Sequence, residues 1–220
     1  MNVKNLSDRA LLVILDGFGF RDASLNNAVH AAKTPILDKL FKHYPLTEIE
    51  AGGVAVGLPK GVIGNSEVGH MNMGAGKPVR QDLVRINEAI NDQKFHKREK
   101  FKELIQKAKE STNRVHLIGL LSDGGVHSHI EHIKEIARRL HDEGITPIVH
   151  AMTDGRDTRR QSAEKYIDEI QSHPYIKLAS LQGRSLGMDR DRRWEKIKKS
   201  MDCLTGQGEI YSGDPQDYLK

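Results

Sequence analysis

Apolar residues gather in short runs rich in β-branched side chains, and most runs end at glycine and a polar residue before helical periodicity takes over. Three such strand and helix units follow one another in the second half of the chain. The strands are VHLIGLLSDGG, TPIVHAMTDGRD and IKLASLQGR, and the helices are HIEHIKEIARRLHDEG, SAEKYIDEIQSHP and DRRWEKIKKSMDCL. Successive units of this kind predict a parallel sheet with right-handed crossovers, and therefore an α/β fold of the parallel-sheet α/β/α type.

The first part of the chain has a different pattern. It opens with a further predicted strand, RALLVILDG, and continues with a short helix near TPILDKLFKHY, a strand at TEIEA and the glycine-rich loop GVIGNSEVGHMNMGAG. A helix at QDLVRINEAI follows Pro78. We therefore predict a change of domain between Gly76 and Gln81, and we place it so that residues 1–78 and 79–220 form separate domains.

Composition limits the classes of partner. The net charge is +4, but basic and acidic residues alternate along helix-like segments such as KREKFKELIQKAKE, which is typical of a solvated face. Aromatic residues make up 5% of the chain, too few for a base-stacking surface, so we expect no nucleic-acid partner. No apolar run approaches the roughly 20 residues of a membrane span and the start lacks a signal core, so a cytoplasmic protein without membrane contact is expected. The single cysteine, Cys203, is interpreted as structural.

Charged residues follow the predicted strands directly. Asp16, Asp123, Asp154 and Arg184 all come where a strand ends. Ligands of open parallel sheets bind at the carboxyl ends of the strands. The chemistry is therefore predicted at this edge.

Arginines are concentrated in two segments near these strand ends. DGRDT supplies Arg156 and Asp157, and GRSLGMDRDRRW supplies Arg184, Arg190, Arg192 and Arg193. A guanidinium group matches the oxygens of phosphate, so a phosphorylated ligand is the natural inference. The alternative is ordinary ion pairing with the aspartates nearby, which we expect for Arg192 and Arg193 unless they face solvent.

Ser66 is the one serine of the glycine-rich loop. Its hydroxyl needs a base or a metal ion before it can act as a nucleophile, and the loop matches neither a GxSxG elbow nor a phosphate-binding loop with its lysine. Asp16 could join Ser66 on a divalent cation. The alternative, favoured by the pattern alone, is that Ser66 caps a helix starting at Glu67 and that Asp16 caps or turns the chain before Gly17.

Three histidines lie close together in GVHSHIEHI. His129 and His132 are three residues apart and His127 precedes them, so a metal-binding trio is conceivable. The alternative, a polar helix start with solvated histidines, is the commoner arrangement.

Five segments then match a known family in order and spacing. LDGFGFR, GNSEVGHMNMGAG, LLSDGGVHSH, DGRDT and GRSLGMDRDRRWEKI closely resemble the cofactor-independent, metal-dependent phosphoglycerate mutases of the alkaline phosphatase superfamily. The resemblance covers nearly the whole chain. It implies interconversion of 3-phosphoglycerate and 2-phosphoglycerate in glycolysis and gluconeogenesis, with two divalent cations, expected to be Mn²⁺, and without bisphosphoglycerate. We also expect a monomer.

Site residues follow from the resemblance position by position. Ser66 corresponds to the nucleophile that becomes phosphoserine, and both Ser66 and Asp16 correspond to metal ligands. The residues that correspond to those holding the glycerate and its phosphate are His127, Arg156, Asp157, Arg184 and Arg190. Of the three clustered histidines only His127 maps onto the site.

The chain departs from the family in two respects. Ser185 and Leu186 stand where family members commonly have two aromatic residues. The family's chains are also much longer, and their later part supplies the other metal ligands. We therefore expect an amino-terminal fragment, inactive alone, that holds part of an alkaline-phosphatase-like domain followed by an incomplete transferase domain. The alternatives are a non-catalytic phosphate-binding or interaction module, and another phosphotransferase of the same superfamily.

Overall fold

The computed structural model describes residues 10–21, 26–215 and 217. The chain divides into two compact units, Met1–Gln81 and Asp82–Lys220, which are described separately below. No helix in the described residues has both the length and the apolar character needed to cross a membrane.

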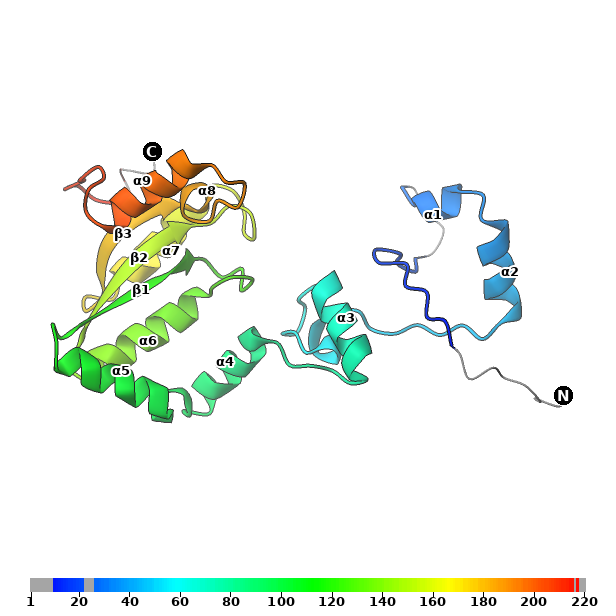
Figure 1. The fold of residues 1–220 in the computed structure, drawn as a ribbon, viewed down its shortest axis with the longest axis horizontal. Coiled ribbons are helices and arrows are strands. Elements are labelled where there is room, and N and C mark those ends of the chain that lie inside the picture. Colours follow the sequence, from blue (N-terminus) through cyan, green and yellow to red (C-terminus); the bar gives the residue numbers. More distant parts are fainter. Residues whose placement is uncertain (1–9, 22–25, 216, 218–220) are drawn as a thin grey trace. The chain divides into compact units, whose positions relative to one another are not determined.

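The second unit contains the predicted parallel sheet (Figure 1). Its strands are β1 (Arg114–Leu121), β2 (Thr146–Thr153) and β3 (Lys177–Gly183), in the order β1-β2-β3. The register pairs Leu121 with Thr153 and Thr153 with Gly183, so the three strands end level with one another. The prediction of a parallel α/β sheet is confirmed.

Helices alternate with the strands as the periodicity predicts. Before the sheet come α4 (Asp82–Asn91), the short 3₁₀ turn η2 (Phe95–Lys97) and α5 (Glu99–Lys109). The crossovers are α6 (Ile130–Asp142) and α7 (Ala163–Gln171), and the chain continues after β3 into α8 (Arg184–Gly187) and α9 (Trp194–Leu204).

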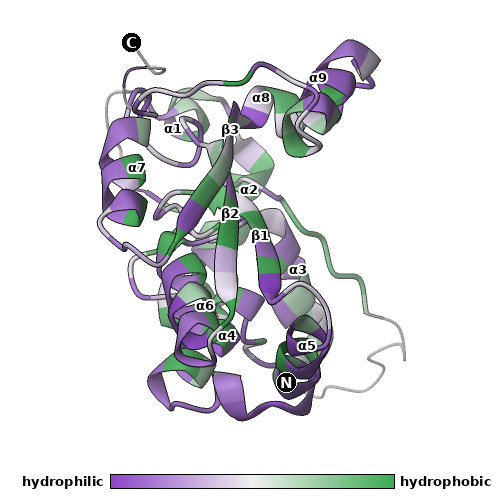
Figure 2. Cartoon of the chain, turned by 90° about the vertical axis from the view of Figure 1, so that its left-hand side faces the viewer, coloured by the Kyte–Doolittle hydropathy of each residue, from purple (hydrophilic) through white to green (hydrophobic). Residues whose placement is uncertain are grey.

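The core of this unit lies between one face of the sheet and the two crossover helices. Val149 and Ala151 of β2 are fully buried against apolar residues of α6 and α7. On α6 the buried residues Ile130, Ile133, Ala137 and Leu140 recur every three or four positions, which forms one apolar stripe. Hydrophobic and hydrophilic positions accordingly alternate along α6 in Figure 2. Truncating the fully buried Leu140 to alanine should cost about 2–5 kcal/mol of stability.

The opposite face of the sheet carries α8. Met152 of β2 points away from Val149 and Ala151, and an added side-chain carbon on Gly187 of α8 would lie 2.8 Å from the Met152 methyl group. A larger residue at position 187 would therefore require the flexible end of the Met152 side chain to move.

The first unit contains α1 (Ala28–Ala31), α2 (Pro35–His43), the 3₁₀ turn η1 (Gly53–Val56) and α3 (Ser66–Ala75). Its small core cluster joins Val56, Leu58 and Val68. The helix expected near TPILDKLFKHY is therefore present as α2. A second helix forms within the glycine-rich loop.

Two strands predicted for the first unit are wrong over the residues that the structure describes. Residues 10–15 and 47–51 form no strand, and Leu11 and Ile49 are 88% and 84% exposed. A β-strand exists only when its backbone pairs with a neighbour, and no strand of this unit's described residues is there to pair with. An apolar run alone therefore predicted these elements incorrectly.

Candidate anion-binding cleft and serine pair

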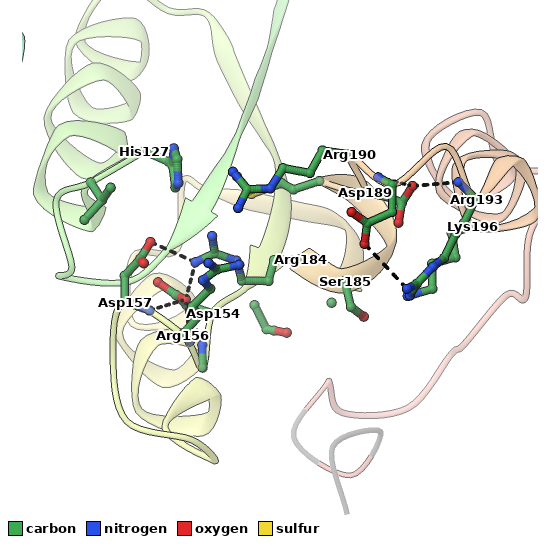
Figure 3. Close-up of a pocket in the computed structure, with 16 residues that line it drawn as sticks. His127, Asp154, Arg156, Asp157, Arg184, Ser185, Asp189, Arg190, Arg193 and Lys196 are labelled. Atoms are coloured by element: carbon green, nitrogen blue, oxygen red, sulfur yellow. Dashed lines mark hydrogen bonds and ion pairs between the residues drawn. The ribbon is translucent and has the colours of Figure 1, made fainter. Parts of the chain in front are cut away.

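The carboxyl ends of the three strands open onto a cleft of about 810 Å³ (Figure 3). It is lined by Val126, His127, Thr153, Asp154, Gly155, Arg156, Asp157, Gly183, Arg184, Ser185, Met188, Asp189, Arg190, Asp191, Arg193 and Lys196. All five residues predicted to hold a phosphorylated ligand are in this set. The structure therefore brings them to one cleft, while their roles stay predictions.

Asp154 lies at the centre of the polar contacts beneath this cleft. Its side chain is 1% exposed and accepts hydrogen bonds from Ser122 Oγ and Arg184 Nη1, both at 2.8 Å. Three backbone N–H groups, those of Gly155, Arg156 and Asp157, also donate to its Oδ1 at 2.8, 3.0 and 3.2 Å. Burial opposes the charged form, but these donors outweigh it and hold the pKa of Asp154 well below its usual range.

Arg184 connects Asp154 to Asp157. Its Nη1 donates to Asp157 Oδ2 at 2.8 Å as well as to Asp154, and the two carboxylates raise the pKa of the guanidinium, Asp157 contributing most. A side-chain carbon on Gly124 would lie 2.9 Å from the Asp157 Cβ, so glycine permits the loop after β1 to approach this group.

Several cationic side chains of the cleft are not neutralised. Arg156, Arg190 and Lys196 make no side-chain hydrogen bond or ion pair with the described residues, and neither does the imidazole of His127. In Figure 3 the Arg190 guanidinium extends toward His127 and Arg184. The cleft therefore offers positive charge to an anion.

The other two aspartates that line the cleft, Asp189 and Asp191, have partners within their own loop. Asp189 accepts the backbone N–H groups of Asp191 and Arg193 at 3.2 and 2.9 Å, and Asp191 lies 3.5 Å from the Arg193 guanidinium. Ion pairing, the alternative considered for the arginines, thus holds for Arg193 and also for Arg184. Arg192 does not line the cleft.

Asp123 lies at the predicted edge, but its carboxylate faces α7. It accepts a hydrogen bond from the Tyr166 hydroxyl at 2.5 Å and one from Lys165 at 3.4 Å. The bond from Tyr166 is the main reason that the pKa of Asp123 lies below its usual range. Asp123 therefore ties a crossover helix to the sheet and does not line the cleft.

The three clustered histidines have three different environments. His127 lines the cleft, the His129 ring accepts the Glu131 N–H at 3.2 Å as the cap of α6, and His132 Nε2 is 2.6 Å from Asn87 Oδ1. No group of three or more metal-ligating side chains occurs among the residues whose positions are described. The trio interpretation is therefore wrong for these residues.

Ser66 and Asp16 form a pair within the first unit. The Ser66 hydroxyl donates to Asp16 Oδ2 at 2.7 Å, and both residues are exposed. His70 Nδ1 lies 3.2 Å from the same hydroxyl and 2.8 Å from the Ser66 carbonyl oxygen.

The capping interpretation of Ser66 is wrong. Helix α3 begins at Ser66 itself, and its cap is Asn65, whose side chain accepts the Val68 N–H at 3.0 Å. Asp16 does lie in a turn, closed by a 2.9 Å bond from the Phe18 N–H to the Leu15 carbonyl, with Gly17 at a φ of 72°. Because capping does not use the Ser66 side chain, it remains accessible for chemistry.

The donor set of this pair fits part of a divalent-cation site. A carboxylate and a hydroxyl 2.7 Å apart are oxygen ligands of the kind that Mn²⁺ and Mg²⁺ take. Two such ligands leave most of a coordination shell to other groups or to water.

Sequence reasoning missed the hydroxyl of Ser122, and it placed Asp154 at the edge where a ligand was expected without giving it a role in the site. The available signal was their position, since Ser122 comes directly after the last residue of β1 and Asp154 directly after the last residue of β2. What the pattern could not indicate was that the two side chains bond to each other.

Comparisons with known proteins identify the family to which the chain is similar. Residues 86–220 match the family described as BPG-independent PGAM N-terminus. A 2,3-bisphosphoglycerate-independent phosphoglycerate mutase of Hydrogenovibrio crunogenus is 46% identical over 216 residues, 95% of this chain and 41% of that protein. The protein of the same name from Clostridium beijerinckii is 45% identical over 94% of this chain and 41% of its own length.

One solved structure is similar over most of the chain. Leishmania mexicana phosphoglycerate mutase, crystallised at low cobalt concentration, aligns with a TM-score of 0.67 and 34% identity over 79% of this chain and 34% of that one. This chain thus spans about two fifths of the length of the curated relatives.

Proposed function

This chain belongs to the family of BPG-independent phosphoglycerate mutase amino-terminal segments, and on that premise we propose that it is the amino-terminal part of a metal-dependent phosphoglycerate mutase. The reaction is the interconversion of 3-phosphoglycerate and 2-phosphoglycerate. On the same ground we place the enzyme in glycolysis and gluconeogenesis, in the cytoplasm, as a monomer.

The observation that carries the proposal is the charge arrangement of the cleft. Arg184 is held by Asp154 and Asp157, while Arg156, Arg190 and His127 have no partner among the described side chains. Phosphoglycerate is a small ligand with a phosphate at one end and a carboxylate at the other. Several separate cations around one cleft suit a ligand with two anionic groups better than a single cation would.

We assign the chemical step to the first unit. Ser66 Oγ would form a bond to phosphorus as the bond from phosphorus to the substrate O3 breaks, and the proton lost by Ser66 would be balanced by one gained at O3, giving phosphoserine and free glycerate. Return of the phosphoryl group to O2 of the glycerate would then release 2-phosphoglycerate and restore the serine. His127, Arg156, Asp157, Arg184 and Arg190 would retain the glycerate between the two transfers.

Asp16 and Ser66 are the residues that would hold one of two divalent cations. When bound, the cation supplies the lowered hydroxyl pKa that a serine nucleophile requires. The 2.7 Å bond to Asp16 directs the Ser66 proton toward the carboxylate, which leaves an oxygen lone pair free for attack. The first unit is accordingly proposed as part of the phosphatase-like domain and the second as part of the transferase domain.

A coupled mutase assay tests the proposal. The complete enzyme, supplied with Mn²⁺ and 3-phosphoglycerate, should form 2-phosphoglycerate without added bisphosphoglycerate. The 220-residue chain alone should bind 3-phosphoglycerate but not turn it over. Binding without turnover by the complete protein would instead favour a non-catalytic phosphate-binding module, and hydrolysis without isomerisation would favour another phosphotransferase chemistry.

A further inference from the structure

One buried carboxylate connects the ends of all three strands. Asp154 follows β2, and it accepts hydrogen bonds from Ser122, which follows β1, and from Arg184, which follows β3. Asp157 shares the bond to Arg184 but has none to Ser122, and Asp189 and Asp191 bond within their own loop, so no other aspartate lining the cleft has both links.

We infer that Asp154, oriented by Ser122, is a positioning residue that sets the Arg184 guanidinium for an anionic ligand. The inference rests on the proposed function, because it assigns Arg184 to the phosphoglycerate ligand. It adds two residues to the site that act through Arg184 and need not touch the substrate.

The bonding pattern of Arg184 supports this role. Only Nη1 of its guanidinium is bonded to the two carboxylates, and within the described part of the chain Nη2 and Nε have no hydrogen-bond partner. The guanidinium is planar, so when Nη1 is held by two carboxylates the positions open to Nη2 and Nε are also restricted. A long flexible side chain is thereby ordered before the ligand arrives, which lowers the entropic cost of binding.

Ser122 in turn orients the carboxylate. Its hydroxyl bonds Oδ2 while Arg184 and the three backbone N–H groups share Oδ1. Ser122 is 1% exposed, and the N–H of Ile130 donates to its carbonyl oxygen at 2.8 Å, which anchors it to the start of α6. The charge of Arg184 is therefore placed by the rigid sheet and its crossover rather than by a surface loop.

Asp154 stays ionised near neutral pH, because its hydrogen bonds keep its pKa low despite burial. An Asp154→Asn substitution preserves the shape but removes the charge. Its amide can satisfy fewer of the five donors, so Arg184 should lose its fixed orientation.

A double-mutant cycle separates positioning from general stability. Affinity for 3-phosphoglycerate is measured by calorimetry on the 220-residue chain at low salt, for the wild type, Asp154→Asn, Arg184→Ala and the double variant. We expect Asp154→Asn to weaken binding by roughly tenfold in the wild-type background. In the Arg184→Ala background, Asp154→Asn should weaken 3-phosphoglycerate binding by less than about threefold, because the guanidinium through which Asp154 acts is absent.

Two further variants keep the test decisive. Ser122→Ala makes a milder change and should weaken binding only when Arg184 is present. Asp123→Asn is the matched control, because it too removes the charge of an aspartate near the end of a strand. The Asp123 carboxylate bonds the Tyr166 hydroxyl and does not line the cleft. The affinity of this variant should stay within about twofold of wild type, even where its melting temperature falls.

Equal losses in both backgrounds, or a loss for Asp123→Asn as large as that for Asp154→Asn, would overturn the inference. So would absence of any 3-phosphoglycerate or inorganic phosphate binding by the wild-type chain. If the complete enzyme shows no mutase activity, the proposed function fails. The cycle repeated with inorganic phosphate still decides whether Asp154 acts through Arg184.

Discussion

The hydroxyl of Ser66 donates a 2.7 Å hydrogen bond to Asp16, although 50 positions of sequence separate the two residues. The pair forms because α3 begins at Ser66 with its cap provided by Asn65, and because the chain turns at Asp16 and Gly17. We propose this hydroxyl, which is not used for capping and lies against a carboxylate, as the nucleophile. We propose the same two oxygens as the first ligands of a divalent cation.

Ser66→Ala should abolish the mutase activity of the complete enzyme. Removing a covalent nucleophile is expected to lower kcat by at least about a thousandfold, while KM for 3-phosphoglycerate changes little because the cleft is in the other unit. The coupled assay measures both quantities. Ser172→Ala is a suitable control, since this exposed hydroxyl bonds the Glu169 carbonyl oxygen and lies outside the cleft. Turnover by Ser66→Ala close to that of the control would contradict the assignment.

Mn²⁺ should bind the 220-residue chain weakly. Asp16 and Ser66 offer two oxygens, so the ion keeps most of its water, and a dissociation constant of roughly millimolar or weaker is expected. Electron paramagnetic resonance of free Mn²⁺ measures the bound fraction. Asp16→Asn should remove the weak binding. Tight stoichiometric binding that survives Asp16→Asn would place the metal elsewhere.

Arg190→Gln should weaken 3-phosphoglycerate binding by roughly tenfold at low salt, because an unpaired cation of the cleft is lost. Raising the salt concentration should narrow the difference between wild type and variant, since part of the attraction is screened. Arg192→Gln is the matched control: it removes the same charge two positions away, outside the cleft. Equal effects of the two substitutions would show that net charge, not the cleft, controls affinity.

Stability should fall as the pH is lowered through the histidine range. His150 Nε2 lies 2.8 Å from His116 Nδ1, and His150 Nδ1 lies 2.8 Å from Ser180 Oγ. Burial, and then the nearby charge of His116, lower the pKa of His150 in the folded protein below its ordinary value of 6.5. The unfolded chain therefore binds more protons in this range, so the stabilisation is present above pH 6.5 and is lost as the pH falls below it.

Chemical denaturation between pH 5 and 8 measures this slope. His132 contributes in the same direction, because burial is the main cause that lowers its pKa. His150→Gln cannot titrate and should flatten part of the slope. An unchanged pH dependence in this variant would show that the imidazole pair does not control stability.

Local patterns in the sequence were enough to predict most of the second unit. The stripe of Ile130, Ile133, Ala137 and Leu140 specifies a helix that must bury one face, and the apolar runs that became β1, β2 and β3 specify strands. Parallel strands share one edge at their carboxyl ends. The gathering of Arg156, Arg184 and His127 at one cleft was therefore foreseeable once the strands were identified, and the family resemblance selected these residues among the many charged ones.

Only the tertiary structure decided which groups bond across that edge. Helical and strand periodicity depends on residues a few positions apart, whereas the bond from Ser122 to Asp154 joins residues 32 positions apart and depends on the register of two strands. The same limit explains the error at residues 10–15, because an apolar run becomes a strand only when another backbone lies beside it. Sequence thus determined the elements and the charges that they carry, and the packing of the sheet determined which charges are neutralised and which remain free to meet a ligand.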